Sequence, residues 1–570
     1  MRLALLLFFF CEVAQAGTKS STTAPPAGAL EATARSDRPL GERPGKDEAP
    51  GMVRARVDLE YRAGFQSSTP LSLNDLTAEN VRFFDQRLRL DSRAAFGAHV
   101  SFRVVADLLD GVLFGDNGSF QGEPLKSRGS FIGTKSPNLA TLTVDRLDPD
   151  GSSLDRDNYG YTLAPAEPLV LRAAYGEARL PFGLVRAGRQ PLTEGRGVFI
   201  NDGMTPNRWG VSRSMDTLDA FVFGTKLSAI VDSVGGREVD RSEKRGVFLG
   251  VLYGLPVTGM ASPADDLTQV ATTIYYAHDS LEALGAKTKQ LKAGIVGAYR
   301  FGEIFDTDLA TITPFVEWTT DRFRLSAQHV QMLGGTREIS ESLRLLNEQA
   351  GPPEKQAFRG YGGFVELAWL LSNLELILEV DYAAGDDDPS NEASLDQLTF
   401  TADTNVGLHL FENVLAYASA RSARMGVVNL AALDPPTVAV SEVDTRGGVT
   451  NAIVIFPQIV TRPLEALSLR AGVMFAFAER RTVDPVQSTL GKDGSTIEDD
   501  LVGFNGGAPG SYWGTEIDLG LTWTPLQGFD VDVEAAYLFP GDALNDENGD
   551  ASSSAFVAGR LTYHGSIGAL

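Results

Sequence analysis

Long stretches of strict apolar–polar alternation constrain this chain more than any other feature. In VRARVDLEYRA, residues 53–63, every odd position is apolar and every even position is charged. Successive side chains of a β-strand point to opposite faces, so this stretch predicts a strand with one apolar and one charged face. It is also longer than the usual strand of about 5–6 residues. The pattern therefore predicts a strand whose two faces meet very different surroundings.

Five further segments share this design, at both ends of the chain. They are FDQRLRLDSRA (84–94), AHVSFRVVADL (98–108), LELILEVDY (374–382), TEIDLGLTW (515–523) and FDVDVEAAYLF (529–539). Runs of about 9–13 residues suit a tilted strand that crosses a membrane. Aromatic residues near the run ends match the interface girdle of a membrane barrel, namely Tyr382, Trp369, Trp513, Trp523, Tyr537 and Phe539.

The connections between the alternating runs are short and long in turn. Tight connections are expected at 180–183, 371–373 and 525–528, and long polar ones at 110–167, 192–214, 335–358, 385–397, 479–511 and 541–552. This layout predicts a transmembrane, antiparallel, up-and-down β-barrel with short periplasmic turns and long extracellular loops. The barrel is expected to have about 18 strands, with 16 to 20 tolerated. A soluble exported β-sandwich is the alternative, since its strands also alternate.

The first residues have the pattern of an export signal. Met1 and Arg2 precede the apolar run LALLLFFF, and Ala14-Gln15-Ala16 forms a cleavage site, so residues 1–16 are predicted to be a signal peptide. The single cysteine, Cys11, lies within it. Residues 17–52 are rich in Pro, Gly, Ser and charge and are predicted to be a disordered linker. The barrel is assigned to 53–570, with its last strand expected to end near Tyr563, and the protein is placed in the outer membrane.

The charge balance bears on the partners. The formal net charge of −24 argues against a nucleic-acid partner. The partners expected instead are outer-membrane lipid and lipopolysaccharide, together with polar or anionic small solutes or oligosaccharides. No cofactor is predicted.

In a barrel, the charged faces of the strands become the lining of the lumen. A basic sector is predicted from the first strands, with Arg54, Arg56, Arg87, Arg89, Arg93, Arg103, Arg172 and Arg186. An acidic sector is predicted from the last strands, with Glu375, Glu379, Asp381, Glu516, Asp518, Asp530, Asp532 and Glu534. Opposite charges across water orient polar solutes, and a basic wall attracts anions. The alternative is that these charges pair across neighbouring strands and only fill the interior.

Residues 184–227 carry a family resemblance. The motif GRQPLTEGRG (188–197), Trp209 and the segment from NDG (201–203) to DTLDAFVFGTKL (216–227) resemble the alginate-export class of outer-membrane porins and related large Gram-negative barrels. Such porins have 16 or 18 strands and basic pores for anionic polymers. By that resemblance, the residues implied in solute contact are Arg186, Arg189, Arg196, Arg208 and Arg213. One departure is the C-terminal GSIGAL, which lacks the terminal aromatic residue of barrel assembly signals.

Catalytic and metal motifs are absent from the sequence. The five histidines are dispersed, and there is no P-loop, GxSxG or HExxH motif. The acidic run 546–550 resembles a calcium loop, but its glycine is misplaced and a solvated loop is the simpler interpretation. We therefore expect no enzyme but a porin for passive diffusion of polar, including anionic, solutes. The alternative is a plugged structural or surface-interaction protein of the outer membrane.

Overall fold

The computed structural model describes most of the chain from residue 53 onward. The described residues are 53–71, 73, 81–97, 99–115, 167–193, 195, 197–204, 207–212, 216–240, 244–256, 267–283, 285–303, 306–337, 355–387, 394–419, 445, 447–484, 488, 501–503 and 505–569. All of them belong to one compact unit, Glu42–Leu570. The predicted signal peptide and linker lie outside the described residues and stay predictions.

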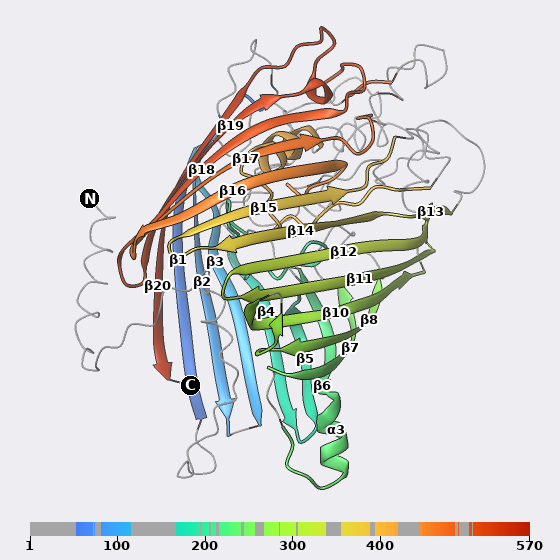
Figure 1. Cartoon of the computed structure of the whole chain (residues 1–570), viewed down its shortest axis with the longest axis vertical. Helices are drawn as coiled ribbons and strands as arrows, with labels where there is room; N and C mark the ends of the chain where they lie inside the picture. The colour runs from blue at the N-terminus through green and yellow to red at the C-terminus, as the bar shows by residue number, and fades with distance from the viewer. Residues whose placement is uncertain are drawn as a thin grey trace. The chain divides into compact units, whose positions relative to one another are not determined.

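A single antiparallel sheet forms the wall (Figure 1). Of its twenty strands, β9 (Glu282–Ala283) and β13 (Gln356–Phe358) only extend β10 and β12, so eighteen strands make the wall within the described part of the chain. These are β1 (Val53–Thr69), β2 (Val81–Phe96), β3 (Val100–Gly115), β4 (Glu167–Leu180), β5 (Gly183–Pro191), β6 (Thr217–Lys226), β7 (Gly246–Pro256), β8 (Thr268–His278), β10 (Ala286–Gly302), β11 (Thr307–Thr320), β12 (Phe323–Thr336), β14 (Tyr361–Leu370), β15 (Leu374–Ala383), β16 (Ala452–Leu464), β17 (Leu467–Phe477), β18 (Tyr512–Leu526), β19 (Phe529–Pro540) and β20 (Ser554–Ala569).

The first and last strands close the wall. β1 pairs with β2 on one side, with Arg56 opposite Arg93, and with β20 on the other, with Tyr61 opposite Tyr563. The predicted closed antiparallel barrel of about 18 strands is therefore confirmed. The expected end of the last strand near Tyr563 is wrong, because β20 continues to Ala569 in register with Ala55. Pairing with β1 gives these last backbone groups the partners that an unpaired tail would lack.

The two faces of the wall follow the alternation in the sequence. Phe102, Leu519 and Val533 are about half exposed on the outer face, whereas Asp107, Asp518 and Glu534 are buried on the inner face. An apolar outer band is what a bilayer requires of a barrel.

Most of the aromatic residues expected near the strand ends do lie on the outer face. Trp369, Trp523, Tyr537 and Phe539 are exposed there, and Tyr382 shares their face but is only partly exposed. The assignment of Trp513 to the girdle is wrong. It is 1% exposed on the inner side, and its indole N–H donates to the carbonyl oxygen of Asn451 at 2.8 Å.

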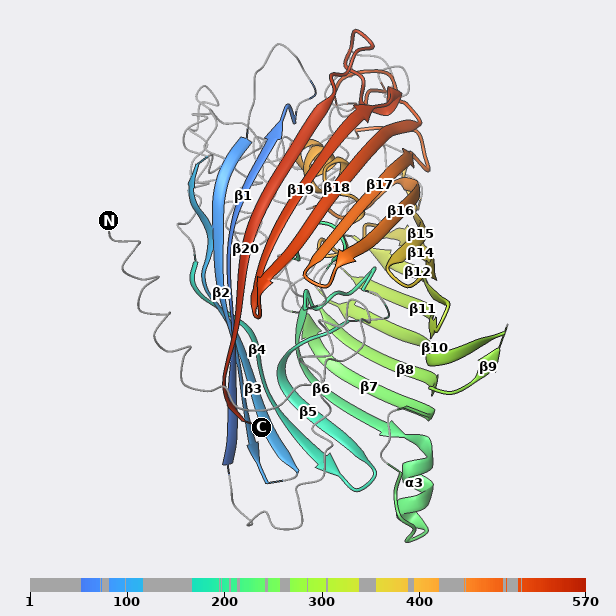
Figure 2. The ribbon, with the colours of Figure 1, turned by 60° about the vertical axis from the view of Figure 1, so that its left-hand side comes forward.

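The connections divide the barrel into a turn end and a loop end. Connections of two or three residues at the turn end include 181–182, 371–373 and 527–528. One connection there is longer than predicted, since β6 is followed by the helix α3 (Leu227–Val234) and only then by β7 (Figure 2). No helix among the described residues is long and apolar enough to span a membrane.

Two segments that follow strands at the loop end fold into the barrel (Figure 1). The first inner segment, made of the described residues 192–193, 195, 197–204 and 207–212, follows β5. The second inner segment, 394–419, follows β15 and contains the π-helical turn η4 (Leu410–Leu415). Phe400 and Phe411 of the second segment and Trp209 of the first are fully buried against inward-facing wall residues such as Phe456 and Met474. A short 3-10 turn, η6 (Asp542–Leu544), packs in the same cluster.

Candidate functional site

The predicted arginines of β2 to β4 line the lumen, and each of the buried ones is paired with an acid. Arg89 binds Asp107 in a bidentate pair at 2.6 and 2.8 Å, and Arg172 reaches the same carboxylate at 2.8 Å. Such planar pairing is the geometry that guanidinium groups favour. Arg103 binds Asp91 in the same bidentate way, at 2.8 and 3.0 Å.

Two more predicted arginines fit this pattern. Arg93 contacts Asp91 at 3.1 Å, and Arg87 contacts Glu60 at 2.5 Å. The basic sector is therefore a ladder of arginines with interleaved acids, as the alternative of cross-strand pairing described. Its local net charge is much smaller than the arginines alone suggest.

The acidic residues of β14 and β15 meet arginines that the sequence reasoning did not single out. Glu375 accepts from Arg462 at 2.8 Å and lies 3.4 Å from Arg324. Arg324 also contacts Glu366 at 3.3 Å. Arg324, Arg462 and Glu366 all occupy inward positions of alternating strands, so the alternation itself was the signal that could have found them.

Arg208, at the tip of the first inner segment, joins this acidic wall. Its guanidinium donates to Glu366 at 2.7 Å, to Glu379 at 3.0 Å and to Gln458 at 3.0 Å. The Arg208, Glu366 and Glu379 side chains are each less than 10% exposed. Because a desolvated charge is costly without partners, these contacts hold the segment tightly at this position.

The first inner segment reaches other parts of the wall as well. Arg87 of β2 donates to the carbonyl oxygen of Ser212 at 3.4 Å. On another side, the backbone N–H of Gly210 donates to Glu534 of β19 at 3.1 Å. Gly210 has φ = +65°, and a side chain there would collide with Asn405, so glycine is needed for this approach. The segment thus spans the lumen between the basic ladder and the acidic wall.

The second inner segment is anchored by Glu516. Its carboxylate accepts the backbone N–H groups of Leu408, His409 and Leu410 at 2.8, 2.9 and 2.5 Å. Three N–H groups on one buried carboxylate form a strong, charge-assisted anchor. The His409 ring also contacts Ser554 of β20 at 2.6 Å.

The two inner segments interlock. Asn201 donates to the carbonyl oxygen of Asp403 at 3.2 Å, and Asn405 donates to the carbonyl oxygen of Trp209 at 3.1 Å. The Asp216 carboxylate, at the end of the same connection, accepts from Thr401 at 3.0 Å. A shift of one segment therefore disturbs the other.

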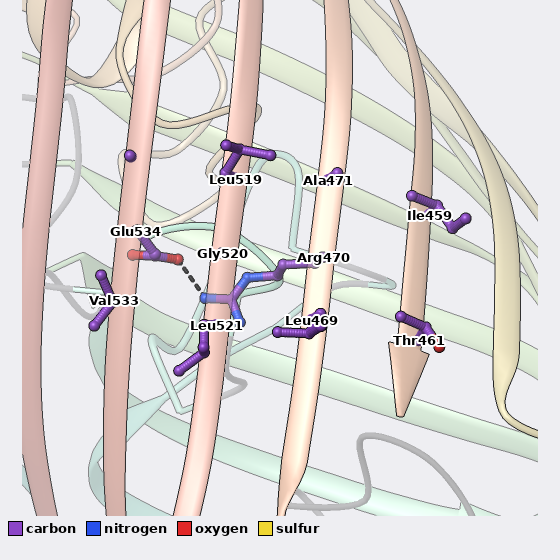
Figure 3. A pocket seen from close by; sticks show the side chains of 11 residues that line it. Ile459, Thr461, Leu469, Arg470, Ala471, Leu519, Gly520, Leu521, Val533 and Glu534 are labelled. Atoms are coloured by element: carbon purple, nitrogen blue, oxygen red, sulfur yellow. Dashed lines mark hydrogen bonds and ion pairs between the residues drawn. The ribbon is translucent and has the colours of Figure 1, made fainter. Parts of the chain in front are cut away.

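A third charged group lies on β17 to β20. Glu534 is 0% exposed and is held between Arg470 at 2.6 Å and Arg560 at 2.5 Å. Figure 3 shows Arg470 crossing over Gly520 to reach Glu534. A Cβ atom at Gly520 would lie 2.5 Å from Nε of Arg470, so glycine makes room for the crossing.

A hollow of about 390 Å³ lies beside this ion pair (Figure 3). Ile459, Leu519 and Val533 of its lining belong to the exposed outer face. The hollow therefore lies on the apolar outer face of the wall, apart from the lumen.

Exposure of the charged side chains changes along the lumen. Near the turn end, the side chains of Arg56, Arg186, Arg462, Asp530 and His564 are 28–45% exposed. We call these five residues the turn-end vestibule. At the level of the inner segments, the side chains of Arg87, Arg89, Arg172, Arg208, Arg470, Glu366, Glu379 and Glu534 are at most 10% exposed. We call these eight residues the central belt. Water thus reaches the vestibule far more readily than the belt.

Other predicted lining residues differ in their surroundings. Asp530 and Asp532 accept hydrogen bonds from Thr524 and Thr522 at 2.6 Å each. Asp381 is 1% exposed, and Asp518 is 0% exposed beside the carboxylate of Glu516. Arg54 is half-buried on the inner face of β1.

The residues implied by the family resemblance are not brought together. Arg186 lies on the inner face, 3.0 Å from Glu177, and Arg208 lies in the central belt. Arg189 does not line the lumen: it pairs with Asp219 at 2.9 Å on the outer face, where Phe221 also lies. The physical reason is that residues three apart on a strand point to opposite faces, so Arg186 and Arg189 do not share one. Arg196 and Arg213 lie outside the described residues.

No metal-binding geometry occurs in the described ranges, where no group of three or more His, Cys, Asp or Glu side chains converges. In the calcium-like loop, the Asp546 carboxylate accepts the backbone N–H groups of Asp550 and Asn548 at 3.0 and 2.8 Å. These hydrogen bonds to the charged form lower the pKa of Asp546. The Asp546 carboxylate thus stabilises the turn in which it lies.

Comparison with known proteins gives distant structural similarity only. No protein-family model matches the chain, and no curated protein matches it. Among solved structures, Acinetobacter baumannii OccAB1 is similar with 12% identity and a TM-score of 0.46, over 92% of this chain and 99% of that one. Pseudomonas aeruginosa OpdK, solved with vanillate, has 9% identity and a TM-score of 0.45, over 90% of this chain and 99% of that one. A. baumannii OccAB4 has 7% identity and a TM-score of 0.43, over 90% and 98%.

Proposed function

We propose that this protein is an outer-membrane channel for passive diffusion of polar solutes, anionic ones included. The observation that carries the proposal is a closed wall of eighteen strands with an apolar outer face and a charged inner face. A barrel of this size is too wide for its own wall side chains to fill, so water or inserted chain must occupy the lumen. The turn-end vestibule supplies exposed charges of both signs to a solute in that water.

The inner segments set the selectivity of the proposed channel. A solute that crosses the central belt must pass or displace the first inner segment, which buries Trp209 in the apolar cluster and makes polar contacts at Arg208 and Gly210. Such contacts are exchangeable, because an anionic or hydrogen-bonding solute offers the same groups as the wall. The channel therefore admits small polar solutes selectively rather than acting as a wide, unspecific pore.

Export, membrane placement and partners belong to the same proposal. Residues 1–16 would direct export and be cleaved, and the exposed outer band would contact lipid and, at the loop end, lipopolysaccharide. The resemblance to alginate-export porins, with anionic oligosaccharides as solutes, remains a prediction. We propose transport without catalysis.

One observation favours the second candidate, a plugged structural protein. The inner segments bury Trp209, Phe400 and Phe411 in a large apolar cluster with the wall. Apolar packing of this kind stabilises a fixed arrangement. Against this, the belt is rich in buried ion pairs, which contribute little stability compared with apolar packing of equal volume. A plug selected for stability alone has no need of them.

Conductance in planar lipid bilayers distinguishes the two candidates. A channel gives discrete openings, and the reversal potential in a salt gradient then reports its ion preference. A plugged protein remains silent. Heat-modifiable gel mobility of the same sample serves as the control, since it shows that a silent protein is nevertheless a folded barrel. Recovery in the soluble periplasmic fraction would overturn the membrane placement itself.

A further inference from the structure

The helix α3 at the turn end exposes its four large apolar residues. Leu227, Ile230, Val231 and Val234 are 37%, 37%, 59% and 85% exposed. By contrast, Ala229 is 5% exposed and the Asp232 side chain only 23%. The exposed positions follow the spacing i, i+3, i+4, i+7, so they form one stripe along the helix. A helix that faces water has the opposite arrangement.

This stripe continues the outer face of the barrel wall. Phe221 and Phe223 of β6 lie opposite Tyr253 and Val251 of β7 on that face, and Leu227 follows them with the same alternation. Val247, at the turn end of β7, is also exposed. The apolar outer face of the wall therefore continues onto the helix, which directly follows β6 (Figure 2).

The chain fixes the helix in this position. Gly236 has φ = +66°, and the N–H of Arg237 donates to the carbonyl oxygen of Asp232 at 2.8 Å, which ends the helix in a common glycine cap. Lys226, just before the helix, contacts Asp240 of the segment that follows it, at 2.6 Å. This contact ties the start of the helix to the segment that leads to β7.

We propose that α3 is an interfacial helix that lies in the headgroup layer of the leaflet at the turn end of the barrel. This inference rests on the proposed membrane placement. We infer that lipid covers the apolar stripe of α3, because the stripe is continuous with the proposed lipid-facing wall. A second protein is a poorer fit, since an eight-residue helix of about 12 Å offers far less than the ~800 Å² per partner of a stable interface. Interfacial helices bury an apolar face about 5–10 Å into the headgroup boundary, which matches a single stripe of this size.

Single-cysteine spin labels test the proposal. The sequence has one cysteine, Cys11, in the predicted signal peptide, so the variants Val231→Cys and Val234→Cys carry one label each in the mature chain. Each is reconstituted in phosphatidylethanolamine–phosphatidylglycerol vesicles, and collision rates with oxygen and with a soluble nickel chelate are measured. We expect oxygen to dominate at both positions. Ser228→Cys, exposed on the flank of the same helix, is the matched control and should favour nickel.

A label at Val251→Cys, on the outer face of β7, separates failure of this inference from failure of the membrane placement. If positions 231 and 234 favour nickel while 251 favours oxygen, α3 lies in water and the inference is overturned. If 231 and 234 are protected from both reagents, a protein covers the stripe, which also overturns it. If 251 favours nickel as well, the outer wall is not in lipid and the proposed function fails. A further substitution, Val231→Asp, is expected to move a label at 234 into nickel contact.

Discussion

Removal of the Arg208 side chain is the sharpest test of how the lumen is closed. The substitution Arg208→Ala deletes hydrogen bonds to Glu366, Glu379 and Gln458 and leaves two carboxylates buried. Removing one partner of a buried ion pair costs about 3–5 kcal/mol. We take the lower end, about 3 kcal/mol, because Arg324 still contacts Glu366.

This loss of free energy destabilises the state in which the first inner segment is bound inside the lumen, which we call the seated state. Since every ~1.4 kcal/mol is tenfold, about 3 kcal/mol shifts the equilibrium between seated and displaced segment about a hundredfold. The displaced state removes a bridge across the lumen. We therefore predict that Arg208→Ala raises the open-state occupancy in planar bilayers and speeds hydrogen exchange of residues 197–212.

The control is Arg245→Ala, which removes an exposed arginine paired with Asp279 at the turn end. It should leave both measurements unchanged. A triple variant, Arg208→Met with Glu366→Gln and Glu379→Gln, removes the stranded charges too and should open the channel less than Arg208→Ala. If Arg208→Ala alters neither conductance nor hydrogen exchange, the reasoning that Arg208 holds the segment is refuted.

Three further predictions concern other anchors of the lumen. Glu516→Gln replaces the charged acceptor of three backbone N–H groups with a neutral one, and each hydrogen bond to a charged group is worth about 1.5–3 kcal/mol. The rate of hydrogen exchange at residues 408–410 should therefore rise. An unchanged rate would contradict the role of Glu516 as an anchor. Gly520→Ala forces Arg470 aside and should cost about 1–3 kcal/mol, seen as a lower temperature of heat modification, while Gly224→Ala, where the space is open, should not. Arg87→Glu with Arg89→Glu makes the ladder acidic and should shift the reversal potential toward cations; an unchanged potential would show that the ladder does not influence the ion preference of the channel.

The alternation of residues by itself determined the wall. Because the side-chain period of a strand is two, the sequence alone places Arg87, Arg89 and Arg103 on the inner face. Applied with equal strictness, the same rule would have placed Arg189 outside and found Arg324 and Arg462 inside. Closure of the sheet also followed, since an open sheet edge is not tolerated in a bilayer, and the count of about 18 strands followed from the alternation of short and long connections.

Only the tertiary structure decided what occupies the lumen. The partners of Arg208, namely Glu366 and Glu379, are more than 150 residues away in sequence, and no local pattern joins them. The second inner segment has no strand period, and its apolar residues Phe400 and Phe411 find their surroundings only when the barrel closes around them. The helix α3 is a similar case. The role of its exposed apolar stripe can be inferred only from its position next to the apolar outer face of the wall. Alternation is a local property of the sequence, and it determines on which face of the wall each side chain lies. The filling of the lumen depends instead on contacts between distant parts of the chain.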